Sequence, residues 1–165
     1  MAVIDLFSRQ IIGFAIHTGD PGGIDTCRMF NSIISGQPKL PKSLSSDNDP
    51  LFRFHRWQAN LRILEIWEIK SVPYVPESHP FIERLFRTVR NELLDQTLFW
   101  GKLDLQTKLN SFKDYYNDTR GHWGLGQLTP NQQRQTGHKP KNLIEPIADQ
   151  WQSHCSGLFH TPIAA

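Results

Sequence analysis

The first third of the chain alternates between short apolar runs and polar breaks. Apolar runs at residues 3–7 and 11–16 flank the polar segment Ser8-Arg9-Gln10, and this arrangement predicts an antiparallel hairpin. Between residues 24 and 34 the apolar positions recur with helical spacing. We therefore expect a helix there, and Gly36 is a typical residue for its end.

The middle of the chain predicts short strands separated by a helix. The segment Ser43-Leu44-Ser45-Ser46 is a candidate strand that leads directly into Asp47. Residues 51–62 have a helical pattern, with Phe52 and Trp57 among the apolar positions. A second short strand is expected at residues 70–72, where proline follows.

The clearest pattern lies in the second half. One apolar stripe has spacings of i, i+3, i+4, i+7 and i+11, which predicts a sustained amphipathic helix. The stripe consists of Ile82, Leu85, Phe86, Val89 and Leu93. A further helix is expected over residues 103–116, whereas residues 131–165 show no clean period and are expected to form a wrapping tail. The order β-β-α-β-α-β-α-α predicts a mixed sheet covered by helices, an α/β layered domain.

Length and charge exclude several classes of protein. A chain of 165 residues with 38% hydrophobic residues suits one domain, and a net charge of +2 is unlike a basic nucleic-acid tail or a disordered chain. The longest uninterrupted apolar stretch, residues 11–16, is far shorter than the roughly 20 residues needed to cross a membrane. Because no secretory signal is evident and Cys27 and Cys155 form no C-x-x-C unit, we expect a cytoplasmic protein without a disulfide framework.

Two carboxylates are candidates for chemistry. Asp47 follows a predicted strand, and Glu83 lies at the border of the apolar stripe, with Arg87 and Arg90 at i+4 and i+7. Carboxylates that converge from a strand end and a helix suit hard cations such as Mg²⁺. The alternative interpretations are an i,i+4 ion pair of Glu83 with Arg87, and a turn or N-cap role for Asp47.

The spacing of these two carboxylates favours the metal-binding interpretation over the alternatives. Thirty-five residues separate Asp47, in Ser46-Asp47-Asn48, from Glu83, in the part of the predicted helix that reads Glu83-Arg84-Leu85. This arrangement closely resembles the second and third acids of the D-D-35-E catalytic core of retroviral integrases and bacterial insertion-sequence transposases. Further motifs that resemble this family, in the same order, are residues 4–9, Tyr115-Tyr116-Asn117, Arg120, His122 and Leu128-Thr129-Pro130.

The resemblance implies a fold, a cofactor and an activity. It implies a ribonuclease H-like mixed sheet flanked by helices, with an integrase-core domain over residues 1–132 and a C-terminal tail over residues 133–165. It also implies Mg²⁺ or Mn²⁺ as cofactor, with Asp47 and Glu83 as catalytic metal ligands for phosphodiester strand transfer. The expected partners are the DNA of mobile-element ends and targets, and further copies of the chain.

The resemblance also implies that something is missing. The first catalytic aspartate of the family belongs to a strand upstream of the segment that matches residues 3–9, so we expect this chain to lack that strand, that ligand and a complete two-metal site. Asp5 matches a different aspartate, and we interpret it as a residue of the turn. Asp49 and His79-Pro80 depart from residues that are common in the family. We expect a core that is impaired alone; the alternative is a non-catalytic DNA-binding or subunit-pairing remnant of a transposase.

Several basic residues are candidates for DNA contact. Arg87 and Arg90 lie beside Glu83, where a phosphate backbone would have to pass. Arg53, Arg56 and Arg62 form a second group, interleaved with aromatic residues of which Trp57 is also a core candidate. Weaker candidates are Arg134, Lys139 and Lys141, which form a basic group in the tail. A zinc site at His154, Cys155 and His160 is not expected because no second cysteine lies near them, and His122 is interpreted as a hydrogen-bonding residue of a loop.

Overall fold

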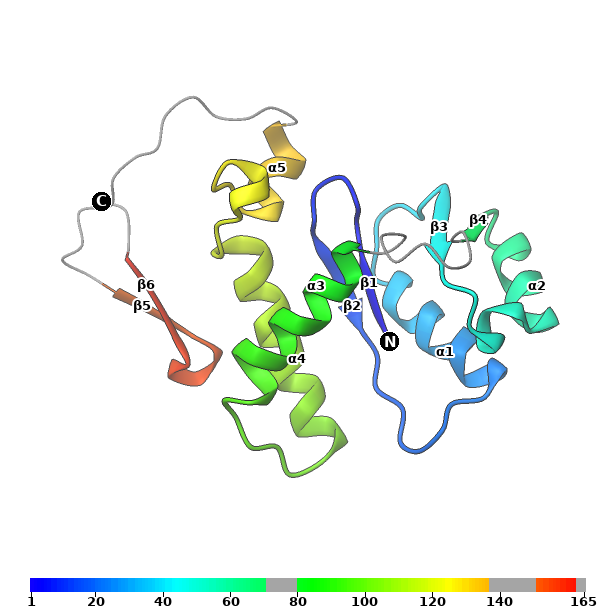
Figure 1. Cartoon of the computed structure of the whole chain (residues 1–165), viewed down its shortest axis with the longest axis horizontal. Coiled ribbons are helices and arrows are strands. Elements are labelled where there is room, and N and C mark those ends of the chain that lie inside the picture. Colours follow the sequence, from blue (N-terminus) through cyan, green and yellow to red (C-terminus); the bar gives the residue numbers. More distant parts are fainter. Residues whose placement is uncertain (71–79, 137–150, 163–165) are drawn as a thin grey trace. The chain divides into compact units, whose positions relative to one another are not determined.

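A computed structural model describes residues 1–70, 80–136 and 151–162 (Figure 1). These residues fall into two compact units. The first unit comprises Met1–Val3 and Ile12–Leu85, and the second comprises Ile4–Ile11 and Phe86–Ala165. No helix in the described ranges is both long and apolar enough to cross a membrane.

The chain begins with the expected hairpin. Strand β1 (Ala2–Ile4) pairs with β2 (Ile11–Phe14). The pairing is antiparallel, because the Ala15 amide donates to the Met1 carbonyl at one end and the Asp5 amide donates to the Gln10 carbonyl at the other.

The first unit places two parallel strands beside two helices. Its remaining elements are α1 (Gly23–Ile34), β3 (Ser43–Ser46), the 3₁₀ helix η1 (Pro50–Arg53), α2 (His55–Ile63) and β4 (Trp67–Lys70). Strands β3 and β4 are parallel, with Ser43 opposite Trp67 and Ser46 opposite Lys70. The helix expected over residues 51–62 is interrupted at Phe54, because this residue has an extended backbone between η1 and α2.

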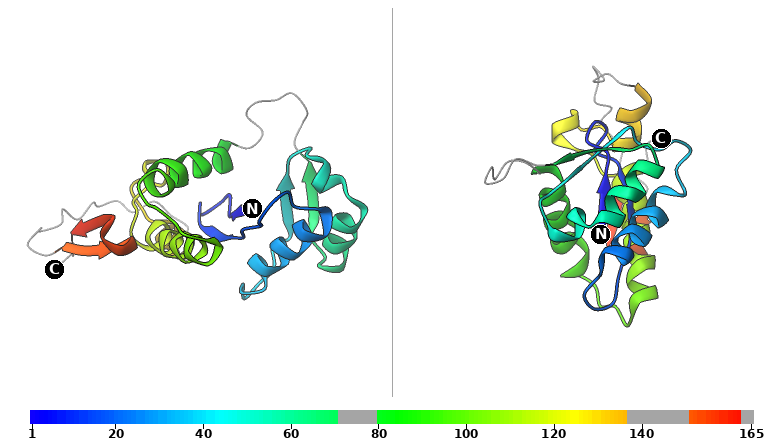
Figure 2. Two further views of the ribbon diagram at one scale, coloured as in Figure 1. Left: turned by 90° about the horizontal axis from the view of Figure 1, so that it is seen from below. Right: turned by 90° about the vertical axis from the view of Figure 1, so that its right-hand side faces the viewer.

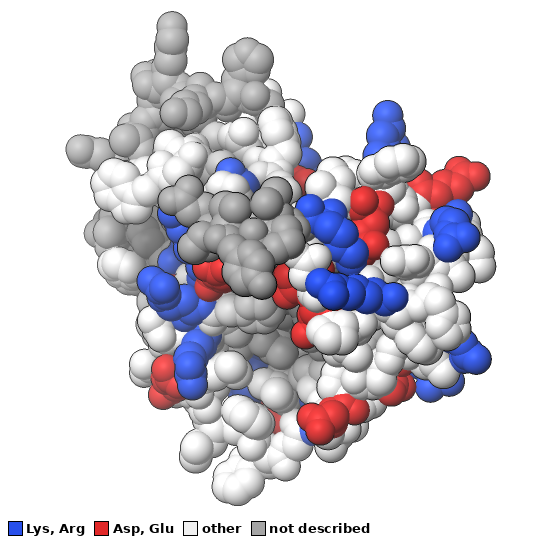
Figure 3. All heavy atoms as spheres, turned by 45° about the vertical axis from the view of Figure 1, so that its right-hand side comes forward, with Lys and Arg blue, Asp and Glu red and all other residues white. Residues whose placement is uncertain are grey.

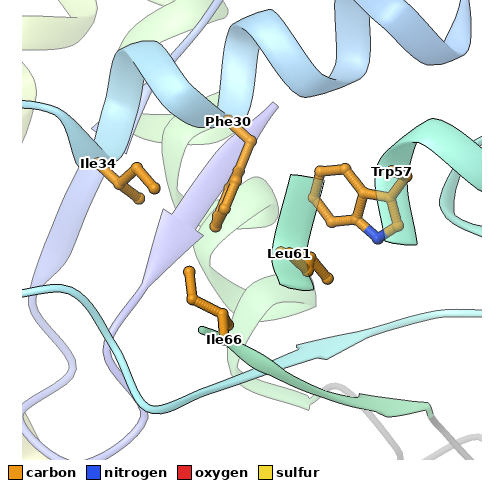
Figure 4. Packing of buried hydrophobic residues seen from close by; sticks show 5 residues of the cluster. All are labelled: Phe30, Ile34, Trp57, Leu61 and Ile66. Carbon is orange, nitrogen blue, oxygen red and sulfur yellow. The ribbon is translucent and has the colours of Figure 1, made fainter. Parts of the chain in front are cut away.

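Aromatic and branched side chains from α1 and α2 form the core of the first unit. Phe30 and Ile34 of α1 point toward Trp57 and Leu61 of α2, with Ile66 below them (Figure 4). The rings of Phe30 and Trp57 meet edge to face with centroids 5.2 Å apart, which is a favourable aromatic geometry. Trp57 is fully buried, so its interpretation as a core residue is confirmed.

Helices dominate the second unit. Helix α3 (Pro80–Val89) belongs to the first unit up to Leu85 and to the second from Phe86. It runs on into a π-helical turn, η2 (Arg90–Leu94), in which the Asp95 amide donates to the Arg90 carbonyl. Beyond it lie α4 (Lys102–Asp118), the 3₁₀ helix η3 (Trp123–Leu125), α5 (Pro130–Thr136), β5 (Trp151–His154), η4 (Cys155–Gly157) and β6 (Phe159–Pro162). Leu109 and Phe112 of α4 are buried, as their spacing predicts.

The C-terminal residues contain more regular structure than their pattern predicts. Strands β5 and β6 form an antiparallel hairpin (Figure 2). The hairpin packs on α4, because the ring of Phe159 stacks on that of Tyr115 with centroids 4.3 Å apart and planes 2° from parallel. Each strand has four residues, so neither is long enough to show a clear alternation of apolar and polar positions.

Three further details differ from the expected elements. Among the described residues the strands pair in three two-stranded sheets, β1-β2, β3-β4 and β5-β6. The strand expected at residues 70–72 is β4, which lies earlier at Trp67–Lys70; residues 71 and 72 lie outside the described ranges. In the stripe of α3 and η2, Leu85, Val89 and Leu93 are buried but Phe86 is half exposed.

Phe112 and Phe86 allow a matched test of this packing. Both lie on helices in the second unit, but Phe112 is 0% exposed and Phe86 is 52% exposed. Phe112→Ala should lower the free energy of unfolding by about 3–5 kcal/mol because it leaves a cavity. Phe86→Ala should cost about 1 kcal/mol or less, since most of that ring already contacts water. Chemical denaturation of both variants checks this, and equal losses would contradict the described burial.

Candidate active site

Asp47 lies at the carboxyl end of β3 in a hydrogen-bonded turn. Its Oδ1 accepts from the Asp49 amide at 3.0 Å, and Asp49 Oδ1 accepts from the Leu51 amide at 2.8 Å, which caps η1. The Asp47 side chain is exposed. Among the described residues no hydrogen-bond donor occupies its second oxygen, Oδ2. The turn role is therefore present, and it engages Oδ1, one of the two carboxylate oxygens.

A polar cluster lies directly beneath this strand end. Glu68 Oε1 accepts three hydrogen bonds, from Ser46 Oγ at 2.8 Å, Trp57 Nε1 at 2.8 Å and Lys70 Nζ at 2.7 Å. Burial, the largest influence, would raise the pKa of the Glu68 carboxyl, but the three hydrogen bonds and the Lys70 charge together hold that pKa below its ordinary value. Sequence reasoning missed this cluster, because a Glu-x-Lys pair on a short strand is also typical of a solvated face.

Glu83 and its neighbouring arginines are exposed on and after α3. Glu83, Arg87 and Arg90 all contact solvent. Within the described residues no ion pair joins Glu83 to Arg87, so the alternative i,i+4 interpretation finds no support. The carboxylate oxygens of Asp47 and Glu83 are the hard donors that Mg²⁺ prefers, and their exposure leaves room for its waters or for phosphate oxygens. In the described ranges no group of three or more His, Cys, Asp or Glu residues is gathered as a metal site.

The other arginine candidates are exposed as well. Arg53, Arg56 and Arg62 contact solvent around the buried Trp57. Basic side chains are interspersed with acidic ones on the face drawn in Figure 3. In the tail group, Arg134 donates to Gln10 Oε1 at 2.8 Å, whereas residues 139 and 141 lie outside the described ranges.

Asn117 fastens α4 to the second strand of the first hairpin. Its Oδ1 accepts from the Ile11 amide at 2.8 Å, and its Nδ2 donates to the Ile11 carbonyl at 2.9 Å. Both hydrogen bonds are buried, and a buried backbone group needs a partner. The single side chain of Asn117 therefore satisfies both the amide and the carbonyl of Ile11. In the turn before Ile11, Asp5 accepts from the Ser8 amide and hydroxyl, in agreement with its interpretation as a turn residue.

Arg120 joins the end of α4 to η2. Its guanidinium makes two hydrogen bonds to the Glu92 carboxylate, at 2.6 and 3.1 Å, and lies over the Tyr116 ring. His122 packs edge-on against the same ring, with centroids 4.5 Å apart. Burial, the larger cause, and the Arg120 charge lower the pKa of His122 to about 4. His122 Nδ1 also lies 3.5 Å from Arg120 Nη1, and the His122 amide donates to the Leu128 carbonyl, in agreement with its interpretation as a hydrogen-bonding residue of a loop.

The two remaining motif regions are local structures. Thr129 Oγ1 accepts from the Gln132 amide while Gln132 Oε1 accepts from the Thr129 amide, a reciprocal cap at the start of α5. No zinc site was expected at His154, Cys155 and His160. There, His154 Nε2 lies 2.9 Å from Thr161 Oγ1 across the β5-β6 hairpin.

Comparisons with known proteins show what this chain is similar to. The model of the family described as "Integrase core domain" matches residues 68–130. The resemblance to integrase cores is confirmed. A curated relative is the insertion element IS476 uncharacterized 39.2 kDa protein of Xanthomonas euvesicatoria, which is 23% identical over 137 residues. That match covers 80% of this chain and 38% of the relative, so the chain spans about two-fifths of that relative's length.

Solved structures extend the integrase-core resemblance to the fold. The catalytic core domain of BIV integrase has 22% identity and a TM-score of 0.60, over 79% of this chain and 81% of that one. The HTLV-2 integrase catalytic core domain, solved in complex with magnesium as a dimer, has 20% identity and a TM-score of 0.60, over 78% and 79%. A simian T-cell lymphotropic virus intasome has 18% identity and a TM-score of 0.65, over 91% and 54%. The ribonuclease H-like α/β fold is therefore confirmed.

The lowered pKa of His122 predicts a pH dependence of stability in this integrase-core fold. In the unfolded chain a histidine titrates near 6.5, whereas His122 in the folded chain stays neutral down to about pH 4. Only the unfolded state takes up this proton between those values, so stability is full above about pH 6.5 and falls as the pH falls toward 4. The loss is at most about 3 kcal/mol, and less because the ring is partly exposed.

Denaturation between pH 7 and pH 4.5 measures this loss. His122→Phe keeps an aromatic ring against Tyr116 and removes the titration, so its stability should depend less on pH than that of the parent chain. The control is His160→Phe at an exposed position, which should keep the parent profile. An unchanged slope in His122→Phe would show that this histidine does not cause the loss.

Proposed function

We propose that this chain is the integrase core of a mobile-element transposase and acts in Mg²⁺- or Mn²⁺-dependent strand transfer on DNA. The observation that carries the proposal is the exposed Asp47 carboxylate, which the Asp49 amide fixes through Oδ1 in a turn at the end of β3. Glu83 supplies a second exposed carboxylate on α3. The family match over residues 68–130, which includes Glu83, supports the assignment.

Each residue has a distinct part in the proposed reaction. Asp47 and Glu83 would hold the divalent cation through their carboxylate oxygens. When bound, the cation supplies the charge that activates a water or a 3′-hydroxyl and stabilises the leaving oxygen of the phosphodiester. Arg87 and Arg90, which follow Glu83 along the same helical segment, would bind the phosphates of the DNA that crosses it. We propose Arg53, Arg56 and Arg62 as additional phosphate contacts, and a homo-oligomer as the working form.

We further propose that Asp47 and Glu83 do not complete a two-metal site by themselves, so that these 165 residues alone are impaired. We do not propose Asp5 as a further ligand, because it is interpreted as a turn residue: its Oδ2 accepts two hydrogen bonds, from the Ser8 amide and hydroxyl, within the hairpin turn. The chain alone should therefore show little Mg²⁺-dependent strand cleavage. Vigorous cleavage that disappears in Glu83→Gln would overturn this part of the proposal.

Metal binding can be tested without turnover. Mn²⁺ titration followed by calorimetry or paramagnetic resonance should detect a site in the chain, and Asp47→Asn or Glu83→Gln should each weaken it by about 10-fold or more. Asn at position 47 keeps an oxygen for the Asp49 amide, so the turn is preserved while the charge is lost. Asp49→Asn is the matched control, because its amide oxygen can still cap η1. Equal weakening by Asp49→Asn, or no Mn²⁺ binding by the parent chain, would count against the site.

DNA binding gives a separate test of the arginines. Arg87→Gln and Arg90→Gln should weaken DNA binding regardless of sequence, and each should reduce the slope of log affinity against log salt by about 1. Arg28→Gln serves as the control, since Arg28 is exposed on α1 and already paired with Asp25. Fluorescence anisotropy at several salt concentrations gives both quantities. If all three variants behave alike, these arginines do not form a specific phosphate contact.

A further inference from the structure

The loop that carries Asp47 is held at both ends by one ammonium group. Lys70 Nζ lies 3.0 Å from Ser46 Oγ, the residue before Asp47, and 2.8 Å from the Phe52 carbonyl in η1. Its third bond, at 2.7 Å, goes to Glu68 Oε1. An ammonium has three donors, and all three are used here. Lys70 therefore bridges the start and the end of the segment that contains Asp47.

Glu68 fixes Lys70 in this position. The side chains of Glu68 and Lys70 are 14% and 29% exposed, so each charge is largely removed from water. A carboxylate at this depth needs its partners, and displacement of Lys70 would leave the charge uncompensated. The Trp57 indole, anchored in the core of the first unit, donates to the same oxygen and holds Glu68 from α2.

The segment between the two anchors is itself ordered by its acids. The Asp49 amide bonds Asp47, and the Asp49 carboxylate caps the helix whose Phe52 carbonyl accepts from Lys70. These bonds form a connected series: Lys70 fixes η1, η1 is capped by Asp49, and the Asp49 amide holds the Asp47 carboxylate. The Asp47 side chain is thus oriented by groups that do not touch it.

We infer that Glu68 and Lys70 are positioning residues for Asp47, which hold its carboxylate in the orientation that a divalent cation requires. The purpose that we infer for this orientation, cation binding, rests on the proposed function. The orientation of Asp47 by Glu68 and Lys70 does not depend on that function and can be tested by itself. A wrongly held ligand lowers metal affinity even when the ligand is present.

Hydrogen exchange of the Asp49 amide measures the orientation directly, because that amide donates to Asp47. In the 165-residue chain, Lys70→Met should speed this exchange by about 10-fold or more, and Lys70→Arg should restore most of the protection. The matched control is Lys108→Met: Lys108 is also 29% exposed, and it bonds a carboxylate (Asp104) and a carbonyl (Leu98) in the second unit. It should leave Asp49 exchange unchanged.

A double variant covers the case in which Lys70→Met does not fold. Glu68→Gln with Lys70→Met keeps an oxygen for Ser46 and Trp57 and leaves no unpaired charge, so only the bridge is lost. If this folded variant retains parental Asp49 exchange, the inference is overturned.

Mn²⁺ affinity then separates this inference from the proposed function. An affinity loss of about 10-fold in Lys70→Met, with rescue by Lys70→Arg, supports both. Faster Asp49 exchange in a chain whose parent binds no Mn²⁺ supports the positioning of Asp47 and overturns its metal role. Unchanged Mn²⁺ affinity with faster exchange overturns the inference that this orientation serves the metal.

Discussion

The buried charge of Glu68 is the constraint on which the first unit depends. A carboxylate removed from water costs several kcal/mol unless hydrogen bonds and an opposite charge replace its hydration. Here the replacements come from β3, α2 and β4, through Ser46, Trp57 and Lys70. These three elements must therefore meet at one point, which fixes the end of β3 and with it the loop of the proposed metal ligand.

In the second unit, too, polar side chains hold separate elements together. Asn117 satisfies both backbone groups of Ile11, and Arg120 makes a two-pronged ion pair with Glu92 across a π-helical turn. Asn117 and Arg120 belong to the motifs by which the sequence resembles integrase cores, yet in this structure their contacts are structural. A motif residue can therefore serve the family by holding helices in place, while the groups proposed for chemistry, Asp47 and Glu83, remain exposed.

The local pattern of the sequence predicted the helices and strands better than it predicted the contacts between them. Helices α1 and α4 follow from apolar spacing that repeats over several turns, and the first hairpin follows from two apolar runs on either side of a polar break. The break at Phe54, the β5-β6 hairpin and the exposure of Phe86 depend on tertiary packing, which spacing does not encode. For the site, spacing and resemblance singled out Asp47 and Glu83. They could not find Lys70, since its partners Ser46 and Phe52 lie 24 and 18 residues away in sequence.

Stability alone does not account for a Glu-Lys pair beneath β3. Apolar side chains of similar volume often replace such buried pairs with no loss of stability, and sometimes with a gain. Hydrophobic contacts, however, lack direction, whereas an ammonium with three fixed acceptors defines where each acceptor must lie. A remnant that only bound DNA through surface arginines would need no such precision at the Asp47 loop. The directional network therefore agrees with the inferred role of Glu68 and Lys70 in orienting Asp47.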